Sequence, residues 1–309
     1  MAVTEMRKVL SDTLEEMMGK DARIIVMDAD LASANGTMGL RNKFPERALD
    51  VGISEANMAS MAAGMSAYGM KPFIVTFTAF ASRRIADQLA ISCAYARQDV
   101  KIIATDAGIT SQTNGGTHMS LEDIGILRSI PGTVVLEVID GIQLKKALPV
   151  IHDYKGVVYV RMVRKNAEDV FAEDYEFDLF KGTKMKSGKD LTIIASGIMV
   201  AEAMEAEKEL REAGIDAEII AIHCLKPIDQ DMIIESARKT GRVLTLENHN
   251  LHGGLYSAVT EVLADACPVR VKGIGIKDHF GEVGSTRFLM EKYGLTKADI
   301  VRASKEICG

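Results

Sequence analysis

The stretch Leu49–Gly69 reads LDVGISEANMASMAAGMSAYG, and it indicates the fold class of this 309-residue chain most clearly. It begins with a short strand-like run and continues into an Ala- and Met-rich segment that predicts a helix from Glu55 to Tyr68. A strand that leads directly into a helix is the repeating unit of α/β folds. Because the residues after Glu55 are so apolar, we expect this helix to be buried and the Glu55 carboxyl to lie in a dry environment.

Strand-like and helical segments alternate on both sides of this stretch. Short β-branched runs that are apolar on both faces predict strands of a parallel sheet, because helices cover both sides of such a sheet. The first half of the chain therefore predicts an α/β domain of this kind. The expected strands include residues 24–27, 73–75, 101–103 and 157–160, and the expected helices include 4–18, 55–68 and 84–96.

The alternation stops after Arg164, where a charged stretch shows no sustained period. We therefore predict a first domain over residues 1–165, a linker over 166–189 and a second, smaller βαβ domain over 190–309. The expected strands of the second domain are 191–195, 217–221, 242–246 and 269–272, and its expected helices are 200–213, 229–239 and 254–264.

Composition and charge narrow the functional classes. The chain is 47% hydrophobic and 26% charged, which is typical of a folded globular protein. Its formal net charge of −6 leaves no basic surplus for a phosphate backbone, so we do not expect a nucleic-acid partner. The cysteines are scattered without a CxxC pair, and no apolar stretch is long enough to span a membrane. We predict a cytoplasmic protein without a disulfide framework or a zinc knuckle.

Glu55 has two interpretations in its local sequence. In the first, Ser54 caps the helix and Glu55 merely complements the helix dipole. In the second, burial favours the protonated form of the carboxyl, which can then donate or share a proton in catalysis.

Two further segments lie at predicted strand ends. Phe77 and Phe80 are three residues apart where a strand turns into a helix, and they are either core packing or a stacking wall for a flat heterocycle. His118 follows the flexible pair Gly115–Gly116 in a long polar loop over residues 104–124. Ligands bind at the carboxyl ends of parallel strands, so His118 is a candidate functional residue.

Together these segments resemble the transketolase family of thiamine diphosphate enzymes. DVGISEANM (50–58), the FxxF pair, GGTHMSLEDIGILRSIPG (115–132) and YVRMVRKN (159–166) occur in the order and spacing of that family. ENHNLHGGLYSAVTEVLA (247–264) resembles its C-terminal domain, so the resemblance covers nearly the whole chain. It implies an α/β fold of two domains with mainly parallel sheets, a pyrimidine-binding domain followed by a transketolase C-terminal βαβ domain.

The resemblance implies roles for single residues. Glu55 would contact the aminopyrimidine ring of thiamine diphosphate and promote removal of the thiazolium C2 proton, which requires a carboxyl that stays protonated. Phe80, with Phe77 nearby, would stack on the pyrimidine, and Asp30 resembles the family's acidic residue beside the cofactor. His118 would face the thiazolium C2 and the hydroxyls of the donor sugar.

Other positions are implied to contact the sugar substrates. Arg164 matches the position where transketolases bind the acceptor phosphate, and Arg161 is its neighbour in register. Asp106 stands where a His usually contacts the sugar phosphate or hydroxyl, and Asn114 stands where an Asp usually reads the C2 hydroxyl. Ser33 adjoins a frequent donor-phosphate position. Because an Asp repels phosphate, we hypothesise a non-standard ketose or acceptor, and a branched, deoxy or sulfonated sugar would fit as well as xylulose 5-phosphate.

The family's diphosphate- and metal-binding segment, GDG…N, has no counterpart in this chain. The resemblance therefore implies the C-terminal section of a split transketolase, paired with an N-terminal subunit that holds the diphosphate through Mg²⁺ or Ca²⁺. In this family the cofactor lies between the two kinds of domain, so we expect the chain to be inactive alone. Two copies of each chain would form a two-fold heterotetramer.

Three other functions remain open from the sequence. A deoxyxylulose phosphate synthase-like enzyme would take pyruvate and use a similar His loop, although it is normally one long chain. The β subunit of a 2-oxo acid dehydrogenase has this size and architecture but generally lacks the GGTHMSLEDIG arrangement. A non-catalytic regulatory paralogue would keep the fold; intact Glu55, Phe80 and His118 argue against it, whereas Asp106 and Asn114 argue mildly for it.

Glu247, His249 and His252 are the one other group that suggests a metal site. Their spacing at a strand-to-helix turn does not hold three ligands on one face. We therefore expect them to have a structural or interface role, and we expect no metal site in this chain.

Overall fold

The structure is a computed structural model that describes residues 2–309. Its strands are β1 (Val3–Glu5), β2 (Ile24–Asp28), β3 (Ala48–Asp50), β4 (Lys71–Phe77), β5 (Lys101–Thr105), β6 (Thr133–Glu137), β7 (Val157–Arg161), β8 (Asn166–Glu168), β9 (Thr183–Lys186), β10 (Leu191–Ala195), β11 (Ala217–Ala221), β12 (Cys224–Lys226), β13 (Arg242–Asn250) and β14 (Arg270–Ile276). Its α-helices are α1 (Met6–Lys20), α2 (Ala32–Asn35), α3 (Met38–Lys43), α4 (Glu55–Ala67), α5 (Thr78–Ser82), α6 (Ala86–Gln88), α7 (Asp123–Ser129), α8 (Gly141–Asp153), α9 (Met199–Glu212), α10 (Gln230–Thr240), α11 (Leu255–Ala266), α12 (Thr286–Tyr293) and α13 (Lys297–Cys308). A π-helix, η1, covers Leu89–Tyr95, and a 3₁₀ segment, η2, covers Gly108–Asn114. Within residues 2–309, none of the helices has the length and apolar character needed to cross a membrane.

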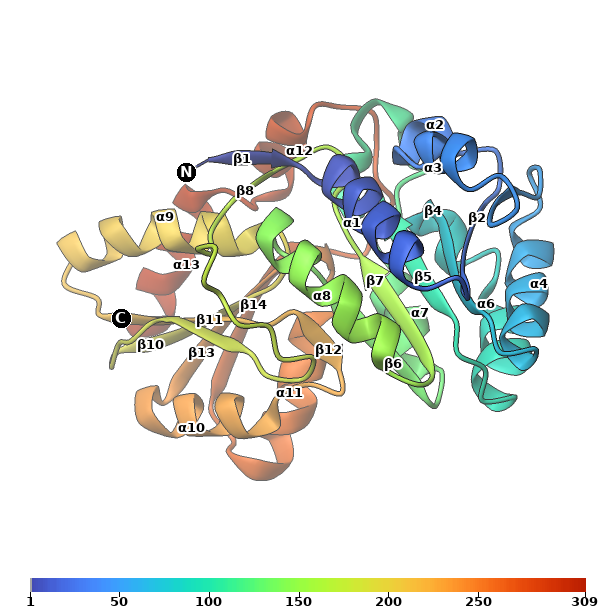
Figure 1. Cartoon of the computed structure of the whole chain (residues 1–309). Coiled ribbons are helices and arrows are strands. Elements are labelled where there is room, and N and C mark those ends of the chain that lie inside the picture. Colours follow the sequence, from blue (N-terminus) through green and yellow to red (C-terminus); the bar gives the residue numbers. More distant parts are fainter. Residues whose placement is uncertain (1) are drawn as a thin grey trace.

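Two mainly parallel sheets lie side by side (Figure 1). The first has the strand order β12-β6-β7-β5-β4-β2-β3, and only β12 runs antiparallel to its neighbour. The second has the order β14-β13-β10-β11-β9, and only β9 is antiparallel. The predicted α/β fold with mainly parallel sheets is therefore confirmed.

Helices cover both faces of the first sheet, as its apolar strands predict. Leu14 of α1 and Leu148 of α8 share a buried cluster with Phe73 of β4. Met58 of α4 lies in a different cluster, which includes Ile74. Because successive residues of a strand point to opposite faces, these neighbours in β4 contact the two helical layers.

The predicted linker, residues 166–189, contains two strands. β8 pairs with β1, and β9 adds to the edge of the second sheet beside β11. In return, β12 from the second half of the chain pairs with β6 of the first sheet. The predicted linker thus forms strands, and the division of the chain after residues 165 and 189 stays a prediction. Charged residues are common on edge strands, so the composition of this stretch did not reveal β9.

α4 begins at Glu55, as predicted, but only one of its faces is buried. Met58, Ala59 and Ala62 pack inward, whereas Ala56 and Ser60 are exposed. The predicted burial therefore holds for one face of the helix only. The exposed face consists of small or polar residues, namely Ala56, Asn57, Ser60, Gly64 and Ala67.

Candidate active site

Several of the predicted functional side chains lie at or after the ends of three neighbouring strands. β4 ends at Phe77, and α5 then carries Phe80. Asp106 and His118 follow β5, and Arg164 follows β7. β4 pairs with β5, and β5 pairs with β7, in parallel in both cases. These turns therefore meet at the carboxyl edge of the first sheet, where such sheets bind ligands.

Three predicted rings form one aromatic cluster. The ring centroids of Phe77 and Phe80 are 5.9 Å apart. The imidazole of His118 lies edge-on to both, with centroid distances of 5.3 Å to Phe80 and 6.2 Å to Phe77. Phe77 is buried, but Phe80 and His118 are partly exposed. Phe80 and His118 can therefore contact a ligand, while Phe77 supports them.

Glu55 is 3% exposed and lies at the N-terminus of α4. The side chain of Ser54 does not cap the helix, because its hydroxyl instead donates a hydrogen bond to the carbonyl of Val51 at 2.9 Å. The first interpretation of this segment therefore lacks its capping contact. The carboxyl is buried, as the sequence predicted.

Arg84 contacts Glu55 and Phe80 together, and the sequence did not single it out. Its Nη1 donates to Glu55 Oε1 at 2.7 Å, and its guanidinium carbon lies 4.0 Å from the centroid of the Phe80 ring. A planar cation thus stacks on the ring and binds the carboxylate at the same time. The Glu55 carboxyl and the Phe80 ring would also suit the aminopyrimidine end of thiamine diphosphate, since an aminopyrimidine is flat and presents nitrogen atoms at its edge.

A polar cluster adjoins the aromatic rings. The Nε of Arg164 donates to Asp106 Oδ1 at 2.9 Å, and the Nδ2 of Asn114 donates to Asp106 Oδ2 at 3.4 Å. The guanidinium of Arg164 lies 5.1 Å from the centroid of the Phe77 ring. Burial raises the pKa of Asp106, and the charge of Arg164 opposes that rise. The structure therefore brings together the predicted substrate residues Asp106, Asn114 and Arg164, and Asp106 offsets part of the positive charge of Arg164.

The segment that contains Asp30 and Ser33 lies beside this cluster. The carbonyl of Ala34 is 3.5 Å from Arg164 Nη1, which places α2 next to the guanidinium. Asp30 and Ser33 are exposed, and neither side chain hydrogen-bonds within the part of the chain that the structure describes. Both therefore remain available to a ligand at this edge.

Arg161 lies away from any surface that a substrate could reach. It is 0% exposed, and its guanidinium donates to Asp123, Glu137 and the carbonyl of Asn248. Side chains alternate along a strand, so Arg161 at the end of β7 points into the boundary between the two sheets. This placement corrects the expectation of a substrate contact, and we leave Arg161 out of the proposed site.

The residues considered for metal binding have structural contacts instead. Both oxygens of Glu247 accept backbone N–H groups at the start of α11, from Leu255 and Tyr256. His249 is buried, whereas His252 is exposed. Among residues 2–309, no group of three or more His, Cys, Asp or Glu side chains is arranged to hold a metal ion.

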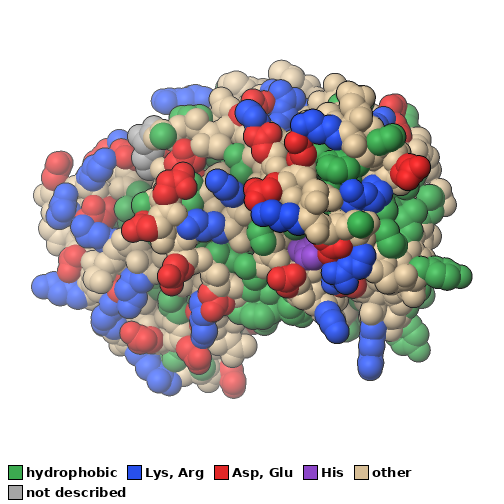
Figure 2. Space-filling view, viewed as in Figure 1, with side chains coloured by type: hydrophobic (Ala, Val, Ile, Leu, Met, Phe, Trp, Pro, Cys, Tyr) green, Lys and Arg blue, Asp and Glu red, His purple; other side chains and the backbone are tan. Residues whose placement is uncertain are grey.

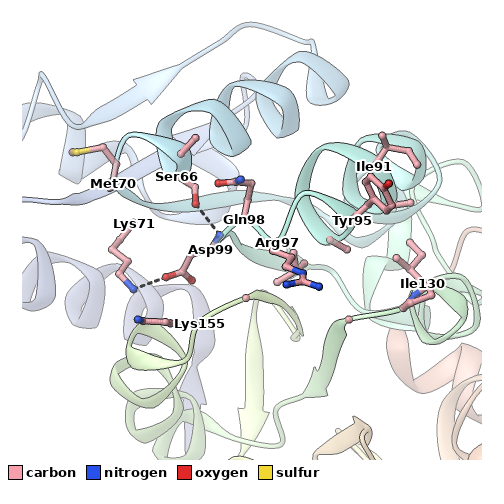
Figure 3. A pocket seen from close by; sticks show the side chains of 18 of the residues that line it. Ser66, Met70, Lys71, Ile91, Tyr95, Arg97, Gln98, Asp99, Ile130 and Lys155 are labelled. Carbon is pink, nitrogen blue, oxygen red and sulfur yellow. Dashed lines mark hydrogen bonds and ion pairs between the residues drawn. The ribbon is translucent and has the colours of Figure 1, made fainter.

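A cavity of about 1300 Å³ lies at the opposite edge of the first sheet (Figure 3). Its lining includes Lys71 and Val157, the first residues of β4 and β7, and the Lys71 ammonium binds Asp99 there. The predicted site residues do not line this cavity. Ligands of open parallel sheets bind at the carboxyl ends of the strands, so we do not place the active site here.

Comparison with known proteins defines the class. Residues 3–169 match the family model "Transketolase, pyrimidine binding domain", and residues 181–300 match "Transketolase, C-terminal domain". The chain therefore belongs to the transketolase family, which confirms the resemblance found in its sequence.

Individual relatives match over nearly their full lengths. The 6-deoxy-6-sulfo-D-fructose transketolase subunit of Clostridium sp. (strain MSTE9) is 48% identical, covering 98% of this chain and 94% of the relative. One of the subunits of the apulose-4-phosphate transketolase of Phocaeicola vulgatus is 35% identical, covering 97% and 96%. A solved structure described as a split gene transketolase, inactive beta4 tetramer, has a TM-score of 0.89 and 39% identity, covering 98% and 97%.

Proposed function

We propose that this chain is the C-terminal subunit of a split transketolase that transfers a two-carbon ketol unit from an anionic ketose to an aldose with thiamine diphosphate. One observation carries the proposal. Glu55, Phe80 and His118 come from three separate segments and lie together at the carboxyl edge of the first sheet in a chain of this family. The two transketolase subunits are covered to 94% and 96% of their lengths, whereas the 1-deoxy-D-xylulose-5-phosphate synthase of Heliobacterium modesticaldum, 34% identical, is covered to only 46% of its length. This difference in chain length favours a split transketolase over a deoxyxylulose phosphate synthase-like enzyme.

Each proposed residue has a distinct task. Thiamine diphosphate supplies a carbon nucleophile for the ketol unit when it is bound. Glu55 would hold a proton at the pyrimidine ring nitrogen, and Phe80 would orient that ring by stacking. His118 would hydrogen-bond to the hydroxyls of the donor and move a proton there. Asp30 would lie beside the cofactor. We assign the diphosphate and its Mg²⁺ or Ca²⁺ to the partner subunit.

An exposed apolar surface along α4 and η1 supports a partner subunit. Ile53, Tyr68, Ile91 and Tyr95 are 73%, 92%, 58% and 83% exposed; the first two flank α4, and the last two lie in η1. Figure 2 shows hydrophobic side chains gathered at the edge of the molecule where α4 lies in Figure 1. Exposed apolar surface of this kind marks contact sites between proteins. We propose that the N-terminal subunit covers it, in a cytoplasmic heterotetramer with two copies of each chain.

The cluster around Arg164 supports a substrate with a single negative charge in this position. Asp106 binds the guanidinium and leaves less positive charge for a ligand. A phosphate group carries roughly −1.5 to −2 charges at pH 7, whereas a sulfonate carries about one. We therefore propose a sulfonated ketose as the first donor to test and a phosphorylated ketose as the second, with Asp106, Asn114, Arg164 and Ser33 contacting the sugars.

Reconstitution with a partner tests the proposal. This chain is co-expressed with the neighbouring reading frame that encodes a diphosphate-binding half, and thiamine diphosphate with Mg²⁺ is titrated by calorimetry into the complex and into this chain alone. We expect binding by the complex only, followed by turnover of a sulfonated or phosphorylated ketose with an aldose acceptor. Equal binding by the isolated chain, or none by the complex, contradicts the two-chain site and favours the regulatory paralogue. Turnover of pyruvate in place of a ketose would identify one of the 2-oxo acid enzymes.

A matched pair of variants tests the role of Glu55 within that complex. Glu55→Gln keeps the size of the side chain but removes its acidity, so we expect turnover to fall by at least about 100-fold. Glu46→Gln makes the same change at an exposed position, and its turnover is expected to equal that of the unmodified complex. Unchanged turnover in Glu55→Gln contradicts the proposed proton transfer.

A further inference from the structure

The loop between β5 and α7, residues 106–122, carries His118 and has an unusual backbone. Asp106 and Gln112 have φ values of 60° and 53°, and ψ of Gln112 is −116°. Residues other than glycine rarely adopt such angles, and they keep them only where surrounding groups hold the backbone in place. The first domain holds part of this loop, for example through Arg164 and Thr78, which bind Asp106, and the second domain holds the rest.

Asn248 of β13 binds the start of the loop through both atoms of its side-chain amide. Its Oδ1 accepts the N–H of Ile109 at 3.0 Å, and its Nδ2 donates to the carbonyl of Ala107 at 3.0 Å. Gly108, between them, has a φ of 53°, and a Cβ there would lie 2.4 Å from the Asn248 carbonyl oxygen. Asn248 is completely buried, so water cannot replace these hydrogen bonds.

The next two residues of β13 bind the far end of the loop. The N–H of Asn250 donates to the carbonyl of Leu121 at 2.7 Å. The N–H of Ile124, in the first turn of α7, donates to His249 Nε2 at 3.2 Å. Three consecutive residues of one strand therefore bind both ends of the loop.

The middle of the loop also packs on the second domain. Gln112 Nε2 donates to Thr286 Oγ1 at 2.8 Å, which fixes the side chain of the strained residue. A Cβ on Gly116 would lie 2.5 Å from the carbonyl oxygen of Gly281, so the two backbones lie in close contact. This part of the loop precedes His118 by only two residues.

Apolar side chains of the loop belong to the core of the second domain. Ile109, Met119 and Leu121 are buried in the same cluster as Leu246 of β13 and Ile276 of β14. Met119 directly follows His118, so its burial limits the movement of the imidazole. The loop thus leaves the first sheet but folds against the second.

We propose that the second domain is the template that fixes the conformation of the His118 loop, and that Asn248 is its main positioning residue. The structural part of this inference is independent of the proposed function, and only the role of His118 in the reaction rests on it. It explains why a domain that carries none of the proposed catalytic side chains belongs to the active chain. Arg161 extends the same arrangement, because it binds the carbonyl of Asn248 and the carboxylate of Asp123, at the end of the loop.

Hydrogen exchange on the full chain, read by mass spectrometry, tests the template directly. Asn248→Ala removes both amide contacts, and we expect the amides of residues 106–124 to exchange about ten- to thirty-fold faster. Thr286→Val removes one contact at Gln112 and keeps the side-chain volume, so a smaller increase is expected near that residue. The control is Thr192→Val, the same change at a buried hydroxyl that binds Thr240 within the second domain. It is expected to leave the exchange of the loop unchanged relative to β4 and β5.

A second readout uses the reconstituted complex. Glu55 and Phe80 lie on other elements, so Asn248→Ala and Thr286→Val are expected to keep the affinity for thiamine diphosphate. A displaced His118 is expected to lower kcat and raise the donor KM. Loop exchange that stays at the wild-type rate, or that rises only in step with the whole chain, overturns the proposal. Should Asn248→Ala fail to fold, the loop exchange of Thr286→Val is compared with that of Thr192→Val, and faster exchange in Thr286→Val alone supports the proposal. Faster loop exchange in a complex without transketolase activity would overturn the proposed function alone.

Discussion

Acidification is expected to destabilise the protein through one buried histidine, His249. Its Nδ1 lies 2.7 Å from the carbonyl oxygen of Asn250 and donates to it, while Nε2 accepts the N–H of Ile124 at 3.2 Å. Both ring nitrogens are thus used by the neutral imidazole. Burial lowers the pKa of His249 to about 4, the charge of Arg161 acts in the same direction, and Asp123 opposes it. Glu247 also faces the ring, 3.8 Å from Nδ1.

The sign and size of the effect follow from the two pKa values. An unfolded chain binds a proton at this residue with a pKa of about 6.5, whereas the folded chain does so only near 4. Below pH 6.5 the unfolded state therefore holds more protons, and the free energy of unfolding falls as the pH decreases. Integration from pH 7.5 to 5.0 gives a loss of about 2 kcal/mol from His249.

Urea unfolding, followed by circular dichroism at pH 7.5 and 5.0 and at one protein concentration, measures this loss. His249→Gln keeps an acceptor for the Ile124 N–H but does not titrate. The unmodified protein is therefore expected to lose about 2 kcal/mol more than His249→Gln between the two pH values. The control, His279→Gln, changes an exposed histidine and is expected to behave as the unmodified protein does. Equal losses in His249→Gln and the unmodified protein would refute the reasoning, because other titrating groups contribute alike to both.

Three further substitutions follow from the site. Arg84→Ala frees Glu55 and Phe80, the two proposed contacts of the pyrimidine. Because Arg84 is half exposed, its contacts are worth only about 1 kcal/mol, and calorimetry on the complex is expected to show up to tenfold tighter cofactor binding. Weaker binding would mean that Arg84 supports the site. Asp106→Asn removes the charge that offsets Arg164, and the kcat/KM ratio of phosphorylated to sulfonated donor is expected to rise by about tenfold, roughly 1.4 kcal/mol; a constant ratio speaks against Asp106 as the selecting residue. Gly108→Ala adds a steric conflict to an unfavourable φ, and urea unfolding is expected to show a loss of about 2–3 kcal/mol in the free energy of unfolding. The control is Gly214→Ala, where φ is 80° but an added Cβ would contact nothing, so a loss of only about 1 kcal/mol is expected. Equal losses in Gly108→Ala and Gly214→Ala would show that the loop moves to accommodate the Cβ and that the steric conflict does not destabilise the protein.

The sequence alone determined the family and many of the local elements, although not strands such as β9. The apolar run after Glu55 placed the start of α4 at its observed residue, and runs apolar on both faces located β2, β4, β5 and β7. These features depend on residues close together in the chain, and the period of the apolar positions encodes them. The order of motifs then sufficed to indicate the transketolase family.

Tertiary structure decided which side chains meet. Arg84 adjoins Glu55, which lies 29 residues earlier in the chain, and Arg161 joins the buried contacts between the domains while Arg164 faces the site. Asn248 reaches a loop more than a hundred residues before it. No local pattern marks such partners, because they depend on which strands become neighbours and on which face each side chain leaves its strand. A charged or amide side chain reads as polar in the sequence, and only packing determines whether water, a substrate or another part of the chain satisfies it.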